Sequence, residues 1–534
     1  MKINKFTSLF ATCLLMGLTA CSNDNISDAD SGNSAKDKDL TGKTSFSITS
    51  EAKTRTSGVY DDSGVNFYWT TNDNIWVKSG SATSPTLTAS SSNNITSTTA
   101  SAKFYFDGIY TAQSYPVRYT GNASNSGNTV TIATSQNQDE ANNATQLGTV
   151  GDCGVGTATR QTDGSYKFNL SHEASYITFM PYYSKEALAA SAVVTQINVT
   201  VGNGESLAGT FNFSDSGLGA VNSSSSNSVT LTLNGTSSTT GFPIPTTATA
   251  AKNAAIMVVA PGTYSTFKVT YSLYDSVTGT KSTISYTYSG KTCTAGKNQK
   301  ISTDLGMATY TSRKNKYYMW DAVNNYWDGH ANSQPLLNDA VSTDYATSST
   351  DSRWYNTAFT KNVQTKAINS CKDQPTFEAL TWYIEGGSPQ VDNKTLWVFA
   401  NHLYAGGIWL KKQSKIPGFI STMSYPSAFT WNLGQDIPYS VPISGKPEAS
   451  VRSSYFYLPA LGKYVDGKLT GLGVSGYYWA STPNPVNNGD RNAGYGKVIS
   501  ANCLRFTIDQ TDIDNVYVRS YYERYVGMQV QKFE

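Results

Sequence analysis

The sequence predicts a mainly β protein made of antiparallel β-sandwiches. Between Phe46 and Leu305, β-branched and aromatic residues alternate with polar residues in short runs that end at Ser, Gly or Asn. No long stretch of helical periodicity interrupts these runs. Short and regularly spaced strands of this kind are typical of sandwiches. A region of this length divides most easily into two of them, and we place the boundary near residue 160, after a Gly-rich segment.

The predicted strands follow one another along this region with the period of two that a half-buried strand requires. Each run is bounded by residues that favour turns. The clearest runs are 65–69, 104–106, 129–132, 166–170, 176–179, 196–201, 228–233, 255–259, 267–273 and 282–288.

Composition limits the function classes. Charged residues make up 15% of the 534-residue chain, aromatic residues make up 12%, and the formal net charge is +2. Nucleic-acid binding requires a clustered excess of Lys and Arg, which this nearly neutral chain lacks. The length exceeds what a single hydrophobic core requires, so we expect several domains.

The N-terminal residues read as an export signal. Lys2 and Lys5 precede a short apolar run that is unsuited to spanning a membrane. Residues 1–20 end in Leu18-Thr19-Ala20 before Cys21, which resembles a bacterial lipobox. The resemblance implies a lipoprotein acylated on Cys21, and acyl chains of this kind anchor a polar chain to a bilayer. Residues 21–43 contain almost no large apolar side chain and are predicted to form a flexible tether.

The composition changes near residue 312. Eight of the ten Trp residues lie after this point, so we expect a different kind of domain over 312–534. Within it, Pro375–Glu385 is predicted to be a helix, with Pro in the first turn and Gly386 as terminator. Phe377, Leu380 and Ile384 share one face of this helix. The rest is a mixture of strands and loops, which predicts an α+β domain.

Residues 44–308 resemble the fimbrillin family, the subunits of type V pili. The matching segments are Thr54-Arg55-Thr56, Trp69 with 72–77, 168–172 leading to 177–179, and a closing strand at 295–301. The resemblance implies two transthyretin-like fimbrillin domains, at 44–160 and 161–308. It also implies a surface lipoprotein precursor in the outer membrane.

The fimbrillin resemblance carries an assembly mechanism. In that family, an Arg-specific protease removes the tether and the first strand of the precursor. A strand from another pilus subunit then fills the groove that is left, by β-augmentation. Arg55 and Thr56 are the residues that the resemblance places at the cleavage site. Phe46 and Ile48 then lie on the departing strand. An ordinary exposed arginine in a loop is the alternative interpretation of Arg55.

Residues 371–534 resemble the C-type-lectin-like domains of bacterial surface proteins. The matching segments are 371–382, 456–460, 476–482 and the closing 525–530. A subunit that accepts a strand and ends in a bulky domain fits a tip adhesin. Tyr477 and Trp479 are the candidate ligand-binding residues, for a glycan or protein of a host or bacterial surface. The alternative function is a permanently anchored lipoprotein that binds polysaccharide for uptake.

The sequence contains few of the residues and motifs that enzymes use for catalysis. The chain has His172, His330 and His402, and it lacks the HExxH, GxSxG and CxxC motifs, so we expect no catalytic site and no cofactor. His172 is predicted to be a hydrogen-bonded core residue. Asp509, Asp512 and Asp514 fit no EF-hand spacing and are predicted to form a solvated turn, so we expect no metal site.

Four cysteines remain beyond Cys21 in an exported chain, which favours disulfides. The local pairings are Cys153 with Cys293 and Cys371 with Cys503, among three that are possible. Free buried thiols stay open as an alternative for the first pair.

Overall fold

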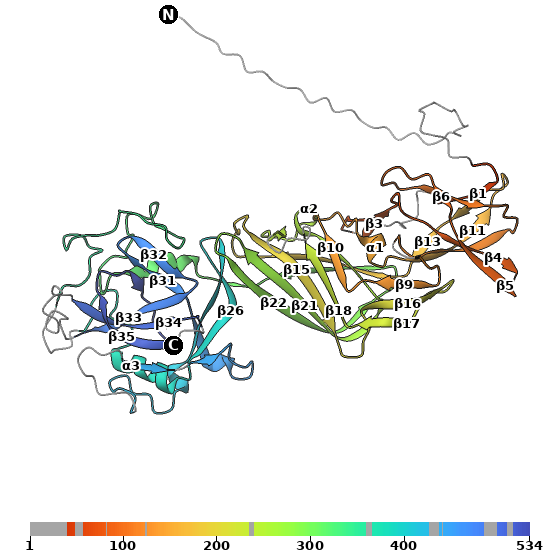
Figure 1. The fold of residues 1–534 in the computed structure, drawn as a ribbon. Helices are drawn as coiled ribbons and strands as arrows, with labels where there is room; N and C mark the ends of the chain where they lie inside the picture. The colour runs from red at the N-terminus through yellow and green to blue at the C-terminus, as the bar shows by residue number, and fades with distance from the viewer. Residues whose placement is uncertain are drawn as a thin grey trace, which may run out of the picture. The chain divides into compact units, whose positions relative to one another are not determined.

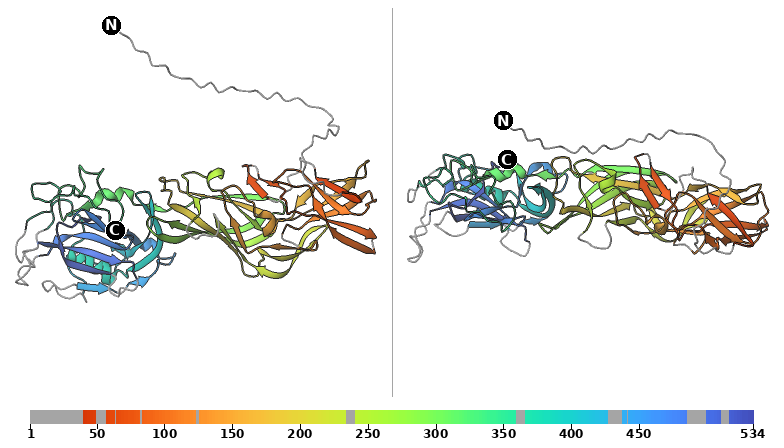
Figure 2. Two further views of the ribbon diagram at one scale, coloured as in Figure 1. Left: turned by 45° about the horizontal axis from the view of Figure 1, so that its top comes forward. Right: turned by 90° about the horizontal axis from the view of Figure 1, so that it is seen from above.

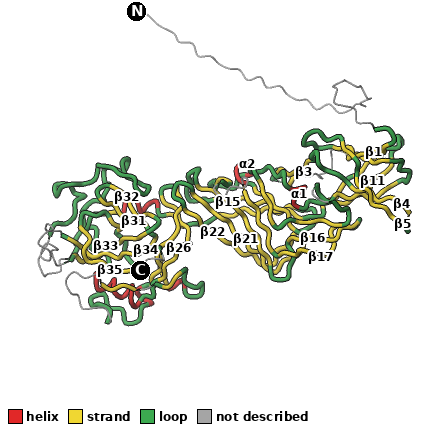
Figure 3. Tube along the Cα trace, in the orientation of Figure 1, coloured by secondary structure: helices red, strands yellow, loops and turns green. Residues whose placement is uncertain are grey.

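Strands dominate the fold of the chain, and helices are short (Figure 3). The computed structural model describes residues 40–48, 57–62, 64–81, 83–122, 125–233, 240–358, 366–426, 437–440, 442–484, 499–509 and 516–534. Residues 43–534 form one compact unit and residues 1–42 form another. The predicted mainly β fold is therefore confirmed, whereas the predicted lipidation residue Cys21 and the predicted tether up to residue 39 lie outside the described residues.

The largest sheet contains the first strand of the chain. Its order is β5-β4-β8-β11-β12-β1-β7-β6, and β13 pairs with β11. The strands are Lys43–Ile48 (β1), Trp76–Ser81 (β4), Ser84–Ala89 (β5), Ser92–Asn93 (β6), Ala102–Asp107 (β7), Ser114–Tyr119 (β8), Gly154–Arg160 (β11), Tyr166–Phe168 (β12) and Leu170–His172 (β13).

A second group of sheets encloses a larger core. One sheet has the order β10-β18-β15-β21-β22 with β19 beside β15, and it is accompanied by sheets β20-β14-β23, β17-β16-β9 and β2-β3. In both views of Figure 2, yellow and green strands that are distant in sequence run side by side. The strands are Ser57–Tyr60 (β2), Val65–Tyr68 (β3), Thr129–Ile132 (β9), Ser135–Gln138 (β10), Ser175–Tyr182 (β14), Ala192–Val201 (β15), Ala208–Ser214 (β16), Gly217–Ser226 (β17), Ser228–Leu233 (β18), Phe242–Pro243 (β19), Ala255–Val259 (β20), Gly262–Asp275 (β21), Thr280–Cys293 (β22) and Asn298–Asp304 (β23).

The division at residue 160 that the sequence suggests falls inside one sheet. It separates β11 from β12, yet Thr159 pairs with Lys167 and Arg160 pairs with Tyr166. Several elements that precede residue 160 also belong to the second core, which is built mainly by residues 174–307. These elements are β2, β3, β9 and the short helix Leu147–Val150 (α1). Strand periodicity is a local signal, so it locates the strands but not the sheet that each one joins.

The C-terminal region contains two further sheets. Their orders are β24-β26-β27-β30 with β29 beside β26, and β25-β36-β33-β34-β35-β28 with β31 and β32 attached. The strands are Ala308–Thr309 (β24), Tyr317–Tyr318 (β25), Gln390–Phe399 (β26), His402–Lys411 (β27), Ile437–Ser440 (β28), Ile443–Ser444 (β29), Tyr455–Pro459 (β30), Leu461–Val465 (β31), Lys468–Leu472 (β32), Ser475–Pro483 (β33), Ser500–Thr507 (β34), Val516–Glu523 (β35) and Met528–Gln529 (β36).

The predicted helix in this region is present. It begins at Phe377, where the Thr376 side chain caps it by accepting a hydrogen bond from the Ala379 N–H, and it runs through Thr381 (α3) into a π-helical turn, Trp382–Gly386 (η2). Phe377, Leu380 and Ile384 are all buried. The other short helices are Ala250–Asn253 (α2), Thr311–Lys316 (η1), Gln413–Lys415 (η3) and Arg452–Ser454 (η4). The lectin-like assignment of the region stays a prediction.

Candidate strand-exchange site

Strand β1, which is labelled in Figure 1, lies between β12 and β7 and is an interior strand of its sheet. On one side it pairs antiparallel with β7 over six residues, from Lys43 opposite Asp107 to Ile48 opposite Ala102. On the other side it pairs parallel with β12, where Phe46 lies opposite Tyr166. Because β1 is hydrogen-bonded on both edges, its removal would expose an edge of β7 and an edge of β12.

The side chains of β1 alternate between the core and the surface. Phe46 is fully buried and Ile48 is 4% exposed, whereas Ser45 and Ser47 between them are half-buried. This is the two-residue period that places every second side chain of a strand on the same face. Two apolar side chains therefore fix the register of the strand in the sheet.

Phe46 occupies a pocket made of aromatic rings. Its ring stacks on Tyr166 with the centroids 4.6 Å apart and lies edge-on to Phe106, Tyr110 and Tyr115. Burying one large apolar side chain in this way contributes about 1.5–3 kcal/mol, and each aromatic pair adds about 0.5–1.5 kcal/mol. Phe46 is therefore the main anchor of β1.

The hydroxyl groups around the pocket are satisfied internally. The Tyr166 hydroxyl donates to the Ala112 carbonyl at 2.6 Å, and the Tyr115 hydroxyl accepts from the backbone N–H of Thr111 and Ala112. Burial raises the pKa of Tyr110, and the neighbouring Tyr115 raises it further. Burial also raises the pKa of Tyr166. The pocket is thus uncharged at neutral pH and suits an apolar side chain.

Polar contacts hold the remaining residues of β1. Lys43 Nζ lies 3.1 Å from Asp107 Oδ1 in a partly exposed ion pair. The Thr44 hydroxyl donates to the Gly108 carbonyl at 2.8 Å, and the Ser47 hydroxyl donates to the Tyr166 carbonyl at 3.2 Å. Exposed ion pairs contribute little to stability, so the backbone ladders and the two apolar anchors hold the strand.

The connection that follows β1 contains the predicted cleavage site. β1 ends at Ile48, and the next strand, β2, begins at Ser57 and pairs with β3 in a different sheet. Arg55 and Thr56 lie between these strands and outside the described residues. A cut after Arg55 would separate β1 covalently from every later strand of its own sheet.

Most of the residues that form the pocket for Phe46 of β1 were not identified from the sequence. Tyr110, Tyr115 and Tyr166 come from three separate segments, and only the pairing of the strands brings them to Phe46. The alternating aromatic run at 104–106 was the available signal. It predicts a strand correctly but does not identify the partner of that strand.

The predicted disulfides are absent from the structure. Cys153, Cys293, Cys371 and Cys503 are buried, and none of them forms a disulfide. Burial raises the pKa of Cys293 to about 11 and that of Cys371 to about 12. An even number of cysteines in an exported chain favours disulfides on average, but here each thiol side chain packs as a small apolar group in a core cluster.

Tyr477 and Trp479 are not surface platforms for a ligand, contrary to the sequence-based expectation. They are 7% and 1% exposed. The Trp479 indole donates to the Tyr318 carbonyl at 2.8 Å. Tyr477 lies edge-on to Tyr522, and Lys463 Nζ lies 4.6 Å from its ring centroid. Every residue of β33 is buried, so both faces of this strand are covered by other parts of the protein.

His172 is a hydrogen-bonded core residue, as predicted. Its Nδ1 lies 2.7 Å from Asp152 Oδ1, and the Tyr176 hydroxyl also contacts this carboxylate. Phe67 stacks on the imidazole with the ring centroids 4.0 Å apart.

Within the described residues, no group of three or more His, Cys, Asp or Glu side chains is arranged to hold a metal ion. No helix among them is long and apolar enough to cross a membrane.

Comparison with solved structures returns cell adhesion and fimbrial proteins of Bacteroides and Parabacteroides species. A candidate cell adhesion protein of Bacteroides uniformis is 14% identical, covers 50% of this chain and 94% of its own length, and gives a TM-score of 0.29. A fimbrial assembly protein of Parabacteroides distasonis is 11% identical over 49% of this chain and 90% of its own, with a TM-score of 0.26. A fimbrial protein of Bacteroides ovatus is 12% identical over 56% of each chain, with a TM-score of 0.21.

Comparisons with protein-family models and with curated proteins find no match. The functional proposals below therefore depend on the contacts of β1 and on the sequence resemblance.

Proposed function

We propose that this chain is the precursor of a pilus subunit that is assembled by exchanging its own first strand for a strand of another subunit. The observation that carries the proposal is the place of β1: an interior strand, anchored by Phe46 and Ile48, whose following connection contains Arg55. An interior strand near the chain terminus can be replaced by another strand of the same pattern without rebuilding the sheet.

The exchange has a clear energetic basis. Loss of β1 exposes backbone donors and acceptors on β7 and β12 and opens an aromatic pocket to water. An incoming strand with apolar residues at two alternate positions restores the backbone ladders and refills the pocket. Since the pocket is uncharged and lined by Phe and Tyr rings, a large apolar or aromatic side chain at the position of Phe46 fits best.

The predicted export signal at residues 1–20 and the lipobox-like segment before Cys21 support a surface location for the precursor. We propose that Cys21 is acylated and holds the chain at the outer membrane until the protease cuts after Arg55, leaving Thr56 as the new N-terminus. The C-terminal region after residue 312 adds a third set of sheets to the subunit. A terminal domain of this size is suited to the tip of a pilus and to adhesion, and the proposed role requires no enzyme activity and no cofactor.

Two substitutions of one residue test the proposal. Cells expressing the wild-type chain should show a ladder of polymers in unboiled SDS gels of the surface fraction. Arg55→Ala and Arg55→Lys should both leave a monomeric lipoprotein in the outer membrane. The lysine variant is the matched control, because it keeps the positive charge while removing the Arg-specific site. Polymers of normal length in both variants would overturn the proposal.

A further inference from the structure

The sheet with the strand order β10-β18-β15-β21-β22 carries two neighbouring rows of uncharged polar side chains on its outer face. One row crosses all five strands through Asn137, Thr232, Gln196, Ser272 and Thr283. The residues between these positions, such as Leu231, Ile197 and Leu273, are buried in the core. The row therefore lies on the side of the sheet that faces away from the core.

The next row is also uncharged, but its side chains bond to one another. It crosses the sheet through Ser135, Thr230, Asn198, Thr270 and Ser285. Asn198 Nδ2 donates to Thr230 Oγ1 at 2.8 Å, and the hydroxyls of Thr270 and Ser285 are 2.8 Å apart. In the first row, the described part of the chain provides no hydrogen-bond partner for the side chains of Gln196, Thr232 and Thr283. Their donors and acceptors are available to a ligand.

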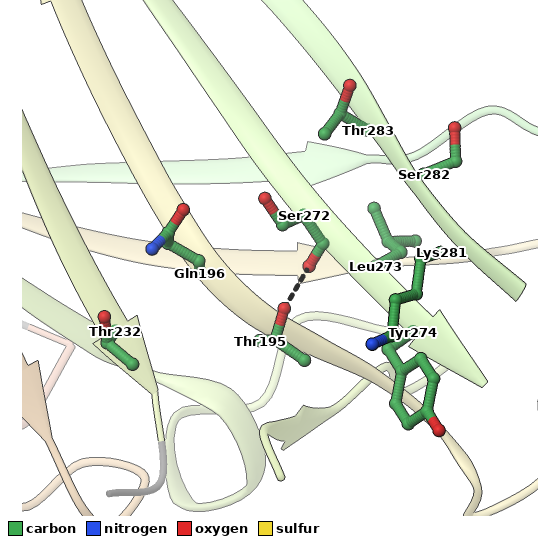
Figure 4. Close-up of a pocket in the computed structure, with 9 residues that line it drawn as sticks. All are labelled: Thr195, Gln196, Thr232, Ser272, Leu273, Tyr274, Lys281, Ser282 and Thr283. Atoms are coloured by element: carbon green, nitrogen blue, oxygen red, sulfur yellow. Dashed lines mark hydrogen bonds between the residues drawn. The ribbon is translucent and has the colours of Figure 1, made fainter. Parts of the chain in front are cut away.

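A β-bulge hollows the face at this row. The register between β15 and β21 shifts between Val194 and Gln196, so Thr195 is the extra residue, and its hydroxyl donates to the Ser272 carbonyl at 3.3 Å. Thr195 and Gln196 both border a hollow of about 530 Å³ (Figure 4). Bulges often bend a strand where a side chain must be redirected. At one end of the hollow, Lys281 Nζ lies 5.0 Å from the centroid of the Tyr274 ring.

We propose that this hollow, which we call the hydroxyl row site, binds a segment of an uncharged polysaccharide. Sugar hydroxyls both donate and accept hydrogen bonds, as do the Thr and Ser hydroxyls and the Gln amide that face them. The Tyr274 ring offers an apolar face next to these polar groups. No carboxylate belongs to either row, and Lys281 is the single charged residue lining the hollow in the described structure, so charge complementarity favours a neutral polymer over a polyanion or a polycation.

This site is independent of strand exchange, because none of its residues lies on β1, β7 or β12. The test therefore uses the whole chain carrying Arg55→Ala, which cannot enter the proposed assembly. Native electrophoresis is run in gels that contain starch, xylan, galactomannan or mixed-linkage β-glucan, with heparin as the charged comparison. We expect at least one neutral polymer to retard the protein.

The variants remove hydroxyls without changing the shape of the strands. Thr232→Val with Thr283→Val keeps β-branched residues at both positions, and we expect the affinity for the retarding polymer to fall about tenfold, the loss of two hydrogen bonds. Tyr274→Leu should also weaken binding. Thr86→Val, at an exposed position of β5, is the matched control and should leave binding unchanged. No retardation by any neutral polymer, retardation by heparin alone, or equal binding by the double variant would overturn the proposal.

Discussion

The ring of Phe46 stacks on the ring of Tyr166 with the centroids 4.6 Å apart and the planes within 10° of each other. The strand that the proposed cleavage removes therefore carries the side chain around which Phe106, Tyr110 and Tyr115 also pack. Under the proposed strand exchange, the precursor holds this strand firmly and the assembled subunit receives an equivalent side chain from another chain. The same pocket would then serve both states and link folding of the precursor to assembly of the polymer.

The first prediction concerns the anchor itself. Phe46→Ala should lower the free energy of unfolding of the precursor by about 3–5 kcal/mol, because it leaves a cavity among aromatic rings. Phe46→Leu fills more of the pocket than Ala does, so it should lower the free energy of unfolding by less. This variant should stay folded, so that its unfolding can be measured. Ser45→Ala, at a half-buried position of the same strand, should change stability by at most about 0.5 kcal/mol. Urea unfolding of the three variants checks this.

Once the strand has been removed by cutting after Arg55, the substitution at position 46 should have no effect, because the residue is no longer part of the protein. Equal unfolding midpoints for wild-type and Phe46→Leu precursors would contradict the anchoring role of Phe46.

The second prediction concerns the thiols. At pH 8 the buried Cys153, Cys293, Cys371 and Cys503 of the native chain should react very slowly with a thiol reagent, because they are shielded from solvent and burial raises the pKa values of Cys293 and Cys371 to about 11 and about 12. After denaturation without reductant, Cys153, Cys293, Cys371 and Cys503 should all react. If any of these four cysteines fails to react in the denatured chain, the disulfides that the sequence suggested are present in the protein.

The third prediction concerns the junction between β21 and β27. The buried Asp275 carboxylate accepts from the Leu403 N–H at 3.0 Å and lies 3.0 Å from His402 Nδ1. Burial acts to raise the pKa of Asp275, but hydrogen bonds from Leu403, Ser191 and His402 outweigh it, so the pKa lies below its ordinary value. Asp275→Asn should therefore lower the free energy of unfolding at pH 7 by about 1–3 kcal/mol.

The pH dependence of that difference has a definite sign. A carboxylate with a lowered pKa stabilises the fold above its unfolded-state pKa of about 3.9, and this contribution is lost as the pH falls through the folded-state pKa. Between about pH 5 and pH 3 the difference in unfolding free energy between wild type and Asp275→Asn should narrow as the pH falls. Urea titrations across this range measure it, and a gap that widens toward low pH would refute the assignment.

The fourth prediction separates the buried aromatic residues of β33 from a ligand site. Trp479→Phe should lower the free energy of unfolding by about 1–3 kcal/mol, because the Tyr318 carbonyl loses the indole donor. It should leave the affinity of the hydroxyl row site unchanged. Loss of polysaccharide binding at unchanged stability would instead place Trp479 in a binding site.

The sequence predicted the strands well because their signal is local. The strands at 129–132, 228–233 and 255–259 have the predicted bounds, and α3 with its π-helical turn occupies most of the predicted helix. The partners of the strands could not be predicted, since β1 pairs with β12 across a long stretch of chain. Burial was misjudged for Tyr477 and Trp479, because a strand covered on both faces lacks the alternation that distinguishes inside from outside.

The residues of the candidate strand-exchange site were predicted only in part. The resemblance proposed Arg55 as the cleavage site and Phe46 and Ile48 as residues of the departing strand, and the structure shows that the Phe46 and Ile48 side chains are buried. The tyrosines of the pocket were not foreseen. The hydroxyl row site was not foreseen either, because it requires five strands in one register and a bulge at Thr195.

The most direct test of the central claim is N-terminal sequencing of the protein sheared from the cell surface as polymer. Strand removal should give a single sequence beginning at Thr56, with residues 43–48 absent from the polymer. A blocked N-terminus at Cys21 throughout the surface protein would contradict strand removal and would favour a permanently anchored lipoprotein.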